Sequence, residues 1–397
     1  MTSAGVPAAA AQPLYLDASA GAPPAEAVLE AMAAATASAW ANPSSLHGYG
    51  LAAADSLERS RQTIAALLGA EAPQLTFCSG GTEAAHLALL GAAATLPPGR
   101  LLISAVEHPA VEAAAARLIG SGWSVERLPV DQLGRVRMDR LEALLEPPTR
   151  LVSLIWGQSE VGTLQPLQAI AERCRRAGVI LHSDAVQVVG HRPIDFASLE
   201  VDLLSFTAHK LQGPRGIGAL LARPGLELRP LIEGGGQEGG LRSGTEPVVL
   251  AAGFARALQL AQGRLEQHGG RDPLESWRDH LWQSLRALGG VELTGCPNER
   301  LPHHLSVLVR DRAGRPLPGR RLVQALWREG LAVSSGSACQ GGRAGGSPVL
   351  RAMGYPPELA ASGLRLSLGP WLSEEQLHSV PSRFERARLA VAAAEPG

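Results

Sequence analysis

The chain has 397 residues, of which 45% are hydrophobic and 18% charged, and its formal net charge is −1. This composition excludes disordered and collagen-like chains. The balanced charge provides no broad positive field, so we expect no direct binding to nucleic acid. Residues 1–13 have no basic residue and only a short apolar run, so we expect no signal peptide and no membrane span, and a cytoplasmic protein.

The first regular pattern is an alternation of short apolar runs and Ala-rich helical stretches between about residues 75 and 221. Strands that alternate with helices are typical of βαβ units. We therefore expect an α/β fold with a mostly parallel sheet that helices cover on both faces. The expected strands are 75–79, 101–105, 150–156, 179–184, 202–208 and 216–222, and the expected helices are 81–94, 108–120 and 165–178.

A Gly-rich segment at 233–245 ends this pattern. The elements expected after it are one long helix from Pro247 to about Leu288, strands at 304–310 and 331–337, and helices at 319–330 and 374–393. Because domains typically have about 100–200 residues, the length indicates at least two. We predict a large α/β domain at 16–262 and a smaller α/β domain at 263–397, with residues 1–15 packing on the smaller one.

The basic residues show one exception to a general rule. Of 36 lysines and arginines, 35 are arginine, so Lys210 is the single lysine of the chain. A genome rich in G and C explains the general replacement but not the one position that resists it. A guanidinium does not readily lose its proton and cannot act as a nucleophilic amine. Lys210 is therefore a candidate for covalent chemistry, most simply a Schiff base. The alternative is that a single lysine remains by chance and has no chemical role.

Polar residues follow the expected strands where ligands collect in α/β sheets. In Ser79–Leu89 two glycines and a threonine open a helix, where backbone N–H groups would hold a phosphate or simply form a turn and N-cap. Asp184 ends a strand, where a carboxylate can pair with a protonated ring nitrogen or cap a helix. Thr207 and His209 lie beside Lys210 as further phosphate donors. Together these residues predict a pyridoxal-phosphate site.

Two other residues have catalytic chemistry. His108 lies at a strand end, where an imidazole can stack on a flat cofactor and move protons near neutral pH, or have a structural role only. The four cysteines lie far apart without a CxxC pattern, so we expect no metal site and no disulfide framework. Cys339 lies in a Gly-rich loop at 331–346, where we expect an exposed, nucleophilic thiol.

Nine motifs occur in order over nearly the whole chain: YLDASAGAP, NPSSLHGYG, SGGTEAAHLAL, EHPAV, HSDAVQ, SFTAHKLQGPRGIGAL, GGGQEGGLRSGT, SSGSAC and LRLSLG. With them the chain resembles the cysteine desulfurases, in the NifS/IscS-like branch of the class V aminotransferase family. The resemblance implies a fold-type I pyridoxal-phosphate enzyme and a homodimer. It also implies conversion of L-cysteine to L-alanine, with a persulfide that passes to a sulfur acceptor or scaffold protein for assembly of iron–sulfur clusters or thio-cofactors.

The resemblance also implies residue roles. The catalytic residues would be Lys210 as the Schiff-base lysine, His108 as the ring-stacking acid/base and Cys339 as the nucleophile that takes the sulfur. The cofactor would be bound by Asp184 at the ring nitrogen, Gln187 at the phenolic oxygen, Ser159, and Gly81, Thr82, Thr207 and His209 around the phosphate. Thr245 would reach the phosphate of the neighbouring subunit. Arg365, as a bidentate clamp, and Ser159 would bind the substrate.

The chain departs from the family pattern at several positions. The family usually has Asn-Asn-Glu where this chain reads Gln158-Ser159-Glu160, so Ser159 makes a shorter contact and leaves the substrate preference open. Ala208 replaces a common glycine, and Gly239 replaces a common arginine or lysine. The loop after Cys339 reads QGGRAGG in place of a frequent Thr-Ser run, which indicates a different sulfur acceptor.

Three other functions fit parts of this pattern. A lyase for cystine or selenocysteine would release the chalcogen without Cys339. A degenerate homologue would bind the cofactor or a partner without chemistry, although the joint presence of Lys210, Asp184, His108, Cys339 and Arg365 disfavours it. An aminotransferase is disfavoured because that reaction does not need a loop cysteine.

Overall fold

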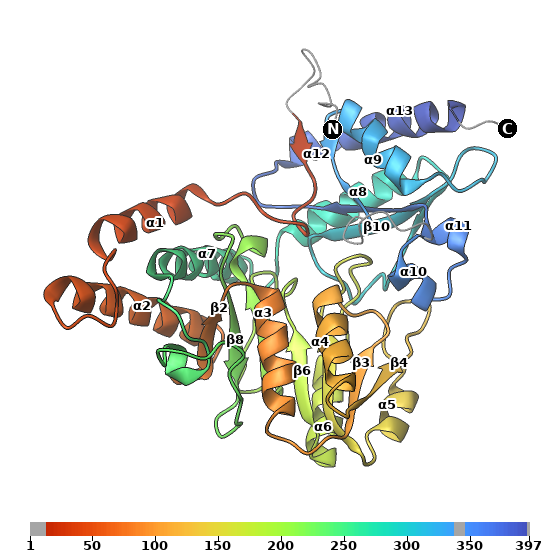
Figure 1. Ribbon diagram of the computed structural model, residues 1–397. Helices are drawn as coiled ribbons and strands as arrows, with labels where there is room; N and C mark the ends of the chain where they lie inside the picture. Colours follow the sequence, from red (N-terminus) through yellow and green to blue (C-terminus); the bar gives the residue numbers. More distant parts are fainter. Residues whose placement is uncertain (1–12, 337–345, 395–397) are drawn as a thin grey trace.

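The computed structural model describes residues 13–336 and 346–394, and its centre is a seven-stranded sheet (Figure 1). The strand order is β2 (Leu75–Cys78), β8 (Gly218–Ala222), β7 (Leu203–Thr207), β6 (Ile180–Asp184), β5 (Thr149–Ile155), β3 (Arg100–Ser104) and β4 (Ser124–Leu128). In the described part of the sheet, β8 alone runs antiparallel to its neighbours. The predicted α/β fold with a mostly parallel sheet is confirmed.

Helices cover both faces of this sheet. They are α3 (Gly81–His86), continued by η2 (Leu87–Gly91), α4 (Pro109–Ile119), α5 (Met138–Leu144), α6 (Leu167–Ala177) and α7 (Val248–Gln267). Leu101 and Ile103 of β3 pack with α3, η2 and α4, whereas Leu102 packs with α5 and α6. Because successive strand side chains point to opposite faces, this alternation assigns each helix to its face. Figure 1 shows α3 and α4 in front of the sheet.

The parallel strands all end at one edge of the sheet. The turns at this edge carry the site. β7 is followed directly by the short 3-10 helix η3 (Ala208–Lys210), and the turn after β3 leads into α4. β8 packs closely against the turn after β2, since a Cβ at Gly218 would lie 2.6 Å from the carbonyl carbon of Gly80. The fold thus brings chemistry-bearing turns together at the carboxyl edge.

A second sheet, antiparallel, lies C-terminal to the first. Its order is β12 (Ser334–Ser335), β13 (Gly363–Ser367), β10 (His304–Val309) and β9 (Val291–Leu293). The helices of this region are α8 (Leu274–Arg286), α9 (Gly319–Arg328), α10 (Pro348–Ala352), α11 (Pro357–Ala360), α12 (Glu374–His378) and α13 (Val380–Ala393). Leucines and valines from the sheet and from α8, α9, α12 and α13 form one apolar core.

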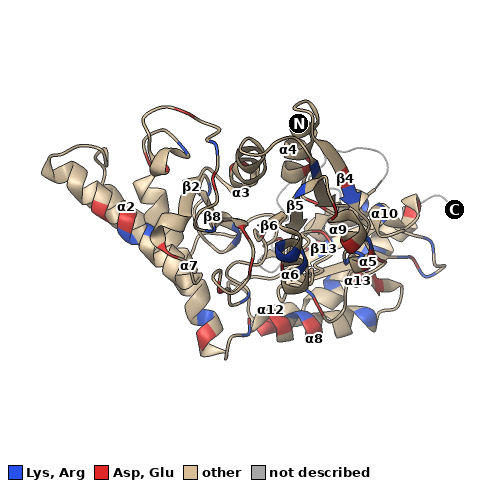
Figure 2. Ribbon diagram, turned by 90° about the horizontal axis from the view of Figure 1, so that it is seen from below, with Lys and Arg blue, Asp and Glu red and all other residues tan. Residues whose placement is uncertain are grey.

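The N-terminal part of the chain connects these regions. Its elements are β1 (Leu14–Tyr15), which pairs in parallel with β11 (Leu331–Ala332), then α1 (Glu26–Ser38), α2 (Gly48–Leu67) and η1 (Ala72–Gln74). In Figure 1, α1 and α2 extend as an arm to one side, and α2 packs against α7. Figure 2 shows both signs of charge along α2, in keeping with the near-neutral net charge.

Three predicted elements differ from the structure. The strand expected at 331–337 is, over its described residues, two short strands, β11 and β12, which belong to different sheets. The single helix expected from Pro247 to Leu288 is two helices, α7 and α8. Gly269 and Gly270 both have positive φ, which ends α7, and Pro273 precedes α8. The helix expected at 374–393 is also divided, into α12 and α13 at Ser379. The proposed domain boundary after residue 262 falls inside α7 and stays a prediction. In the described ranges, no helix is both long and apolar enough to cross a bilayer.

Candidate active site

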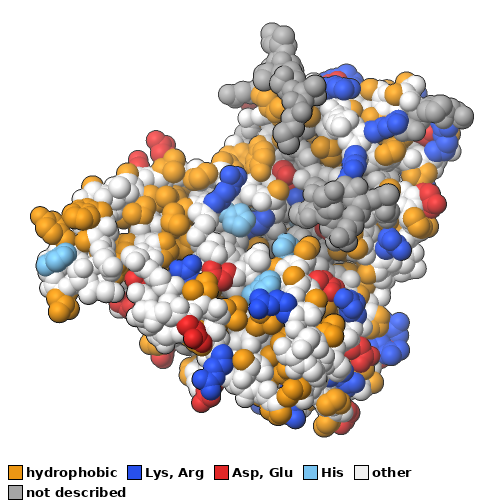
Figure 3. Space-filling model, in the orientation of Figure 1, with side chains coloured by type: hydrophobic (Ala, Val, Ile, Leu, Met, Phe, Trp, Pro, Cys, Tyr) orange, Lys and Arg blue, Asp and Glu red, His pale blue; other side chains and the backbone are white. Residues whose placement is uncertain are grey.

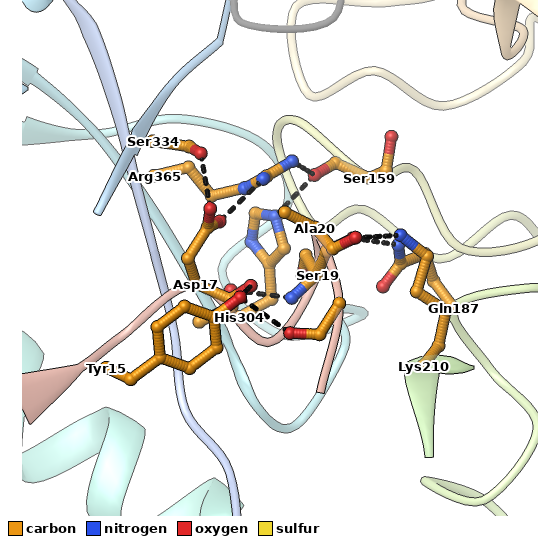
Figure 4. Close-up of polar contacts among 12 residues, drawn as sticks. Tyr15, Asp17, Ser19, Ala20, Ser159, Gln187, Lys210, His304, Ser334 and Arg365 are labelled. Carbon is orange, nitrogen blue, oxygen red and sulfur yellow. Dashed lines mark hydrogen bonds and ion pairs between the residues drawn. The ribbon is translucent and has the colours of Figure 1, made fainter. Parts of the chain in front are cut away.

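Lys210 meets the N-terminal segment of the chain at the carboxyl edge. Its Nζ donates hydrogen bonds to the carbonyl oxygens of Ser19, at 2.6 Å, and Ala20, at 2.9 Å. The buried Gln187 donates from Nε2 to the same Ser19 oxygen at 2.9 Å, and Figure 4 shows the two side chains converging there. The structure thus brings two of the predicted cofactor residues together.

Asp184 and His108 share one electrostatic environment with Lys210. Asp184 is buried at the end of β6, where Oδ1 accepts a hydrogen bond from the Val186 N–H at 2.9 Å. Burial raises the pKa of Asp184, and the charges of His108 and Lys210 act against this shift. Burial lowers the pKa of His108, an effect that Asp184 opposes and Lys210 increases. The three predicted groups therefore lie within electrostatic reach of one another.

The contacts of His108 define its tautomer. It is the N-cap of α4, and its Nδ1 accepts a hydrogen bond from the Ala110 N–H at 3.1 Å. An imidazole nitrogen that accepts from a backbone N–H carries no proton, so the proton of neutral His108 lies on Nε2. The cap also fixes the ring orientation, which leaves Nε2 as the atom that can move a proton.

Thr207 and His209 contact each other directly. The buried Thr207 hydroxyl donates to the carbonyl oxygen of Ile217 at 2.9 Å, so His209 Nδ1, at 3.0 Å, donates to Thr207 Oγ1. Burial, followed by the charges of Lys210 and Arg215, lowers the pKa of His209 to about 4. The ring is therefore neutral near pH 7, with its proton on Nδ1. To donate to a phosphate, the Thr207 hydroxyl would have to turn away from the Ile217 carbonyl oxygen, and the proton of His209 would have to move to Nε2. The phosphate role of this pair therefore stays a prediction.

The predicted phosphate turn lies beside the turn that carries Asp184. A Cβ at Gly81 would lie 2.7 Å from Val186 Cγ2, so any other residue here would force Val186 to shift. No heavy atom lies within 4 Å of the Cβ position of Gly80, and Thr82 is exposed at the start of α3. The Glu83 carboxylate accepts the Ser79 N–H at 2.7 Å. The turn therefore has space beside the start of α3, but the Ser79 N–H is already bonded to Glu83 and is not free for a phosphate.

Arg365 is held at the small-sheet side of the site (Figure 4). Its Nη2 pairs with Asp17 Oδ1 at 2.8 Å, and its Nη1 donates to the Ser159 carbonyl oxygen at 3.0 Å. Asp17 Oδ2 in turn accepts from the Ser334 hydroxyl at 2.7 Å. The Nε of Arg365 is buried and has no hydrogen-bond partner among the described residues. The guanidinium is therefore oriented from two sides.

Ser159 contributes its main chain to these contacts. Its carbonyl oxygen accepts from both Arg365 and His304, whose Nε2 lies 2.9 Å away. Because a carbonyl only accepts, the His304 proton lies on Nε2. Burial, then the charges of Arg300 and Arg365, hold the pKa of His304 well below its usual range. The predicted contacts of the Ser159 side chain with cofactor and substrate stay predictions.

Thr245 is exposed at the end of the Gly-rich segment, which η4 (Glu238–Gly240) interrupts. Glu238 anchors this segment, because its buried carboxylate accepts from Arg61 Nη1 and Nη2 at 2.8 and 2.9 Å and from the Phe77 N–H at 2.8 Å. Thr245 and Ser79 line one cavity of about 200 Å³. The role of Thr245 in a neighbouring subunit stays a prediction.

Cys339 lies outside the described residues, but the three other cysteines are described and buried. Burial raises the pKa of Cys174 to about 12 and raises that of Cys78 further. A buried thiol with a raised pKa is a poor nucleophile. None of these described cysteines has the exposure that sulfur transfer requires.

Glu160 contacts described residues on both sides of 337–345, the stretch that contains Cys339. Its Oε2 accepts from the Ser347 hydroxyl at 2.5 Å, and a Cβ at Gly336 would lie 3.1 Å from the same oxygen. Burial raises the pKa of Glu160 to about 7, and both Ser347 and Arg365 oppose the shift.

Five residues at or beside the site were not predicted from the sequence: Asp17, Ser19, Glu160, His304 and the buried Glu107, which accepts from Ser104 at the end of β3. Ser19 acts through its carbonyl oxygen, which no residue type signals. Asp17 occurs in the YLDASAGAP motif and Glu160 in the Gln-Ser-Glu stretch, so a signal existed for both. Glu107 immediately precedes His108 in the EHPAV motif. His304 had no local signal, because its partner is 145 residues away in the chain.

The class of the protein follows from this geometry together with comparisons with known proteins. The family model for class V aminotransferases matches residues 14–380. The chain therefore belongs to the class V aminotransferase family.

The relatives narrow this class. The chain is 40% identical over 368 residues to a cysteine desulfurase of Cereibacter sphaeroides, covering 92% of each chain. It is 37% identical to the cysteine desulfurase IscS of Methanosarcina thermophila, covering 92% of this chain and 90% of that one. Among solved structures, a NifS-like protein matches with a TM-score of 0.87 and 32% identity, covering 96% of this chain and 100% of that chain. SspA in complex with cysteine matches with a TM-score of 0.78 and 28% identity, over 90% of this chain and 99% of that chain.

Proposed function

We propose that the chain is a pyridoxal-phosphate-dependent cysteine desulfurase, which converts L-cysteine to L-alanine and carries the sulfur as a persulfide on Cys339. The observation that carries this proposal is the position of Lys210, the single lysine, beside Asp184 and His108 at the carboxyl edge of the sheet. The family and the relatives named cysteine desulfurases support the same reaction.

The donor set at this edge fits pyridoxal phosphate. Lys210 has the primary amine that binds an aldehyde, and the buried Asp184 has a carboxylate for a protonated ring nitrogen. Gln187 would donate to the phenolic oxygen, and the turn at Gly81 and Thr82, at a helix start with open space beside it, suits a phosphate. When bound, this cofactor supplies a ring that withdraws electrons from the substrate carbon next to the amine.

The residues of the chain position the substrate and move its protons. Arg365, fixed by Asp17 and the Ser159 carbonyl oxygen, would bind the substrate carboxylate. His108 would carry protons through Nε2, because its Nδ1 is occupied by the helix cap.

Cys339 would take the sulfur as a thiolate. Its sulfur attacks the sulfur of the bound substrate, a sulfur–sulfur bond forms, and the carbon–sulfur bond breaks. The electron pair of that bond goes to the substrate carbon, which takes up a proton and leaves as alanine. The burial of Cys78, Cys174 and Cys296 supports this assignment, since the described cysteines lack access.

A homodimer is part of the proposal. The arm formed by α1 and α2 with the loop between them exposes large apolar side chains, which are Leu29, Trp40, Leu46, Tyr49 and Leu51 (Figure 3). Leu46 is 91% and Trp40 is 65% exposed. A patch of this kind is typical of a subunit interface, and Thr245 would then act across it. The cytoplasmic location, the acceptor or scaffold protein and the domain division belong to the proposal as well.

The test is an absorbance spectrum of the purified protein before and after L-cysteine, with alanine and sulfide assayed in the wild type and in Cys339→Ser. We expect a cofactor band that shifts with cysteine, alanine formation in the wild type, and loss of alanine and sulfide production in Cys339→Ser. Cys174→Ala, on the buried face of α6, is the matched control and should retain activity.

Other outcomes separate the alternatives. Sulfide release that persists in Cys339→Ser would favour the lyase. A protein that binds the cofactor but leaves cysteine unchanged would be the degenerate homologue, and absence of the cofactor band would contradict the role of Lys210.

A further inference from the structure

Glu107 is a buried carboxyl group for which the proposed reaction has no direct use. It directly precedes His108, three residues after the end of β3, and it is 7% exposed. Its Oε1 accepts from the Ser104 hydroxyl at 2.6 Å and from the Ile155 N–H at 2.8 Å. Ser104 ends β3 and Ile155 ends β5, so this one oxygen joins two strand ends directly before His108.

The other oxygen of Glu107 has a different environment. Oε2 is buried and has no hydrogen-bond partner in the described part of the chain. The two donors that reach Oε1 are both neutral, and the neighbours Val106 and Ile155 belong to an apolar cluster. An ionised carboxylate here would place charge on a buried oxygen without a donor, which is very unfavourable. A protonated carboxyl group carries no charge there, and its cost is only that of a neutral O–H without an acceptor among the described residues, which is much smaller.

Asp184 is close enough to act on Glu107. Ile155, which donates to Glu107, is the register partner of Asp184 in the pairing of β5 with β6. Burial raises the pKa of Glu107 to about 8; the hydrogen bonds from Ser104 and Ile155 act against this shift, and the charge of Asp184 adds to it. The titratable groups around the pair are His108 at the start of α4 and Lys210 on η3, and a positive charge on either favours the ionised form of Asp184. Two neighbouring buried carboxyl groups do not both ionise readily, and the contacts favour ionisation of Asp184.

We propose that Glu107 is a positioning residue that stays protonated, so that it joins the ends of β3 and β5 below His108 without adding a second negative charge next to Asp184. This inference rests on the proposed function only in that Asp184 is taken as the partner of the cofactor ring. The protonation state itself is a property of the protein with or without the cofactor.

The direct test is infrared spectroscopy, because the carbonyl stretch of a protonated carboxyl group is separate from the bands of a carboxylate. At pH 7, the difference between the wild type and Glu107→Gln should show loss of one protonated-acid band, in apoprotein and holoenzyme alike. Glu126→Gln, at a half-exposed position on β4, is the matched control and should show loss of carboxylate bands only. Loss of carboxylate bands in Glu107→Gln would overturn the proposal, and it would leave the Cys339 test untouched.

Kinetics give a second readout. Glu107→Ala leaves the Ser104 hydroxyl and the Ile155 N–H without their partner, and we expect a loss in kcat of about tenfold or more. Glu107→Gln keeps a neutral acceptor for both donors and should recover most of this loss, with the pH profile of kcat/KM unshifted. Equal losses in the two variants, or a shift of the profile in Glu107→Gln, would contradict a protonated Glu107. If Glu107→Ala does not fold, the infrared spectrum and the pH profile of Glu107→Gln still decide the question.

Discussion

The two sides of the site are held by different kinds of contact. Asp184 and His108 stand at strand ends, and the bonds that orient them come from Val186 and Ala110, two residues further along the chain. Arg365 is oriented by Ser159 and Asp17, which lie 206 and 348 residues away. The orientation of Asp184 and His108 follows from local backbone geometry, whereas that of Arg365 exists only when the N-terminal segment and the two sheets have assembled.

This difference has consequences for mutation. On the strand-end side, a substitution removes a chemical group while the surrounding backbone keeps its form. On the Arg365 side, a substitution changes contacts that also connect distant parts of the fold. We therefore expect pure losses of chemistry on the first side, and joint changes in substrate binding and stability on the second.

The largest expected effect is that of Lys210→Arg. This variant keeps the positive charge but removes the only primary amine of a lysine side chain in the protein. We expect loss of activity by a factor of about 1,000 or more, with the cofactor band absent, because arginine cannot replace a nucleophilic amine. Absorbance and alanine assays measure this, and thermal unfolding should show a folded variant. Retention of the band with alanine formation would contradict the assignment.

Arg365→Lys tests the clamp on the other side. Lysine is a point charge and lacks the planar fork that contacts Asp17 and the Ser159 carbonyl oxygen. We expect KM for L-cysteine to rise about 10- to 100-fold, with a smaller change in kcat. Steady-state kinetics measure this. A fall in kcat at unchanged KM would show that Arg365 does not bind the substrate carboxylate.

Asp17→Asn tests whether orientation of Arg365 matters. The amide retains the shape but loses the charge that pairs with a nearly buried guanidinium. We expect KM to rise about fivefold and the free energy of unfolding to fall by about 2 kcal/mol. Glu142→Gln is the control, since it removes a surface ion pair with Arg173 and should change stability by less than about 1 kcal/mol. Equal effects in the two variants would remove the distinction between the two sides of the site.

The smallest expected effect concerns pH and the buried His182 in the sheet. Its ring lies between the Ser153 and Ser205 hydroxyls, and burial lowers its pKa to about 3. The unfolded chain binds the proton at about pH 6.5 and the folded chain does not, so stability is present above that pH and is lost as pH falls toward 3. We expect His182→Gln to weaken this dependence, by about 2 kcal/mol at most between pH 7 and 5. Denaturant unfolding at the two pH values measures it, and an equal dependence in both proteins would contradict the prediction.

Sequence reasoning was effective where local patterns determine structure. The apolar runs predicted six strands of the large sheet, and β4 (Ser124–Leu128) was missed because its side chains are only partly buried. The break between α7 and α8 was missed although Gly269, Gly270 and Pro273 signal it. Arg365 was identified only by resemblance, and its partners Asp17 and Ser159 depend on contacts between distant segments, which no local pattern contains.

The most direct test of the account is the mass of the protein after brief exposure to L-cysteine and removal of excess substrate. We predict the gain of one sulfur atom per chain, located by peptide mapping on the peptide that contains Cys339, and no gain in Cys339→Ser or Lys210→Arg. Sulfur found on Cys78, Cys174 or Cys296, or alanine formed at the normal rate in Cys339→Ser, would contradict the assignment of Cys339 as the residue that receives the sulfur.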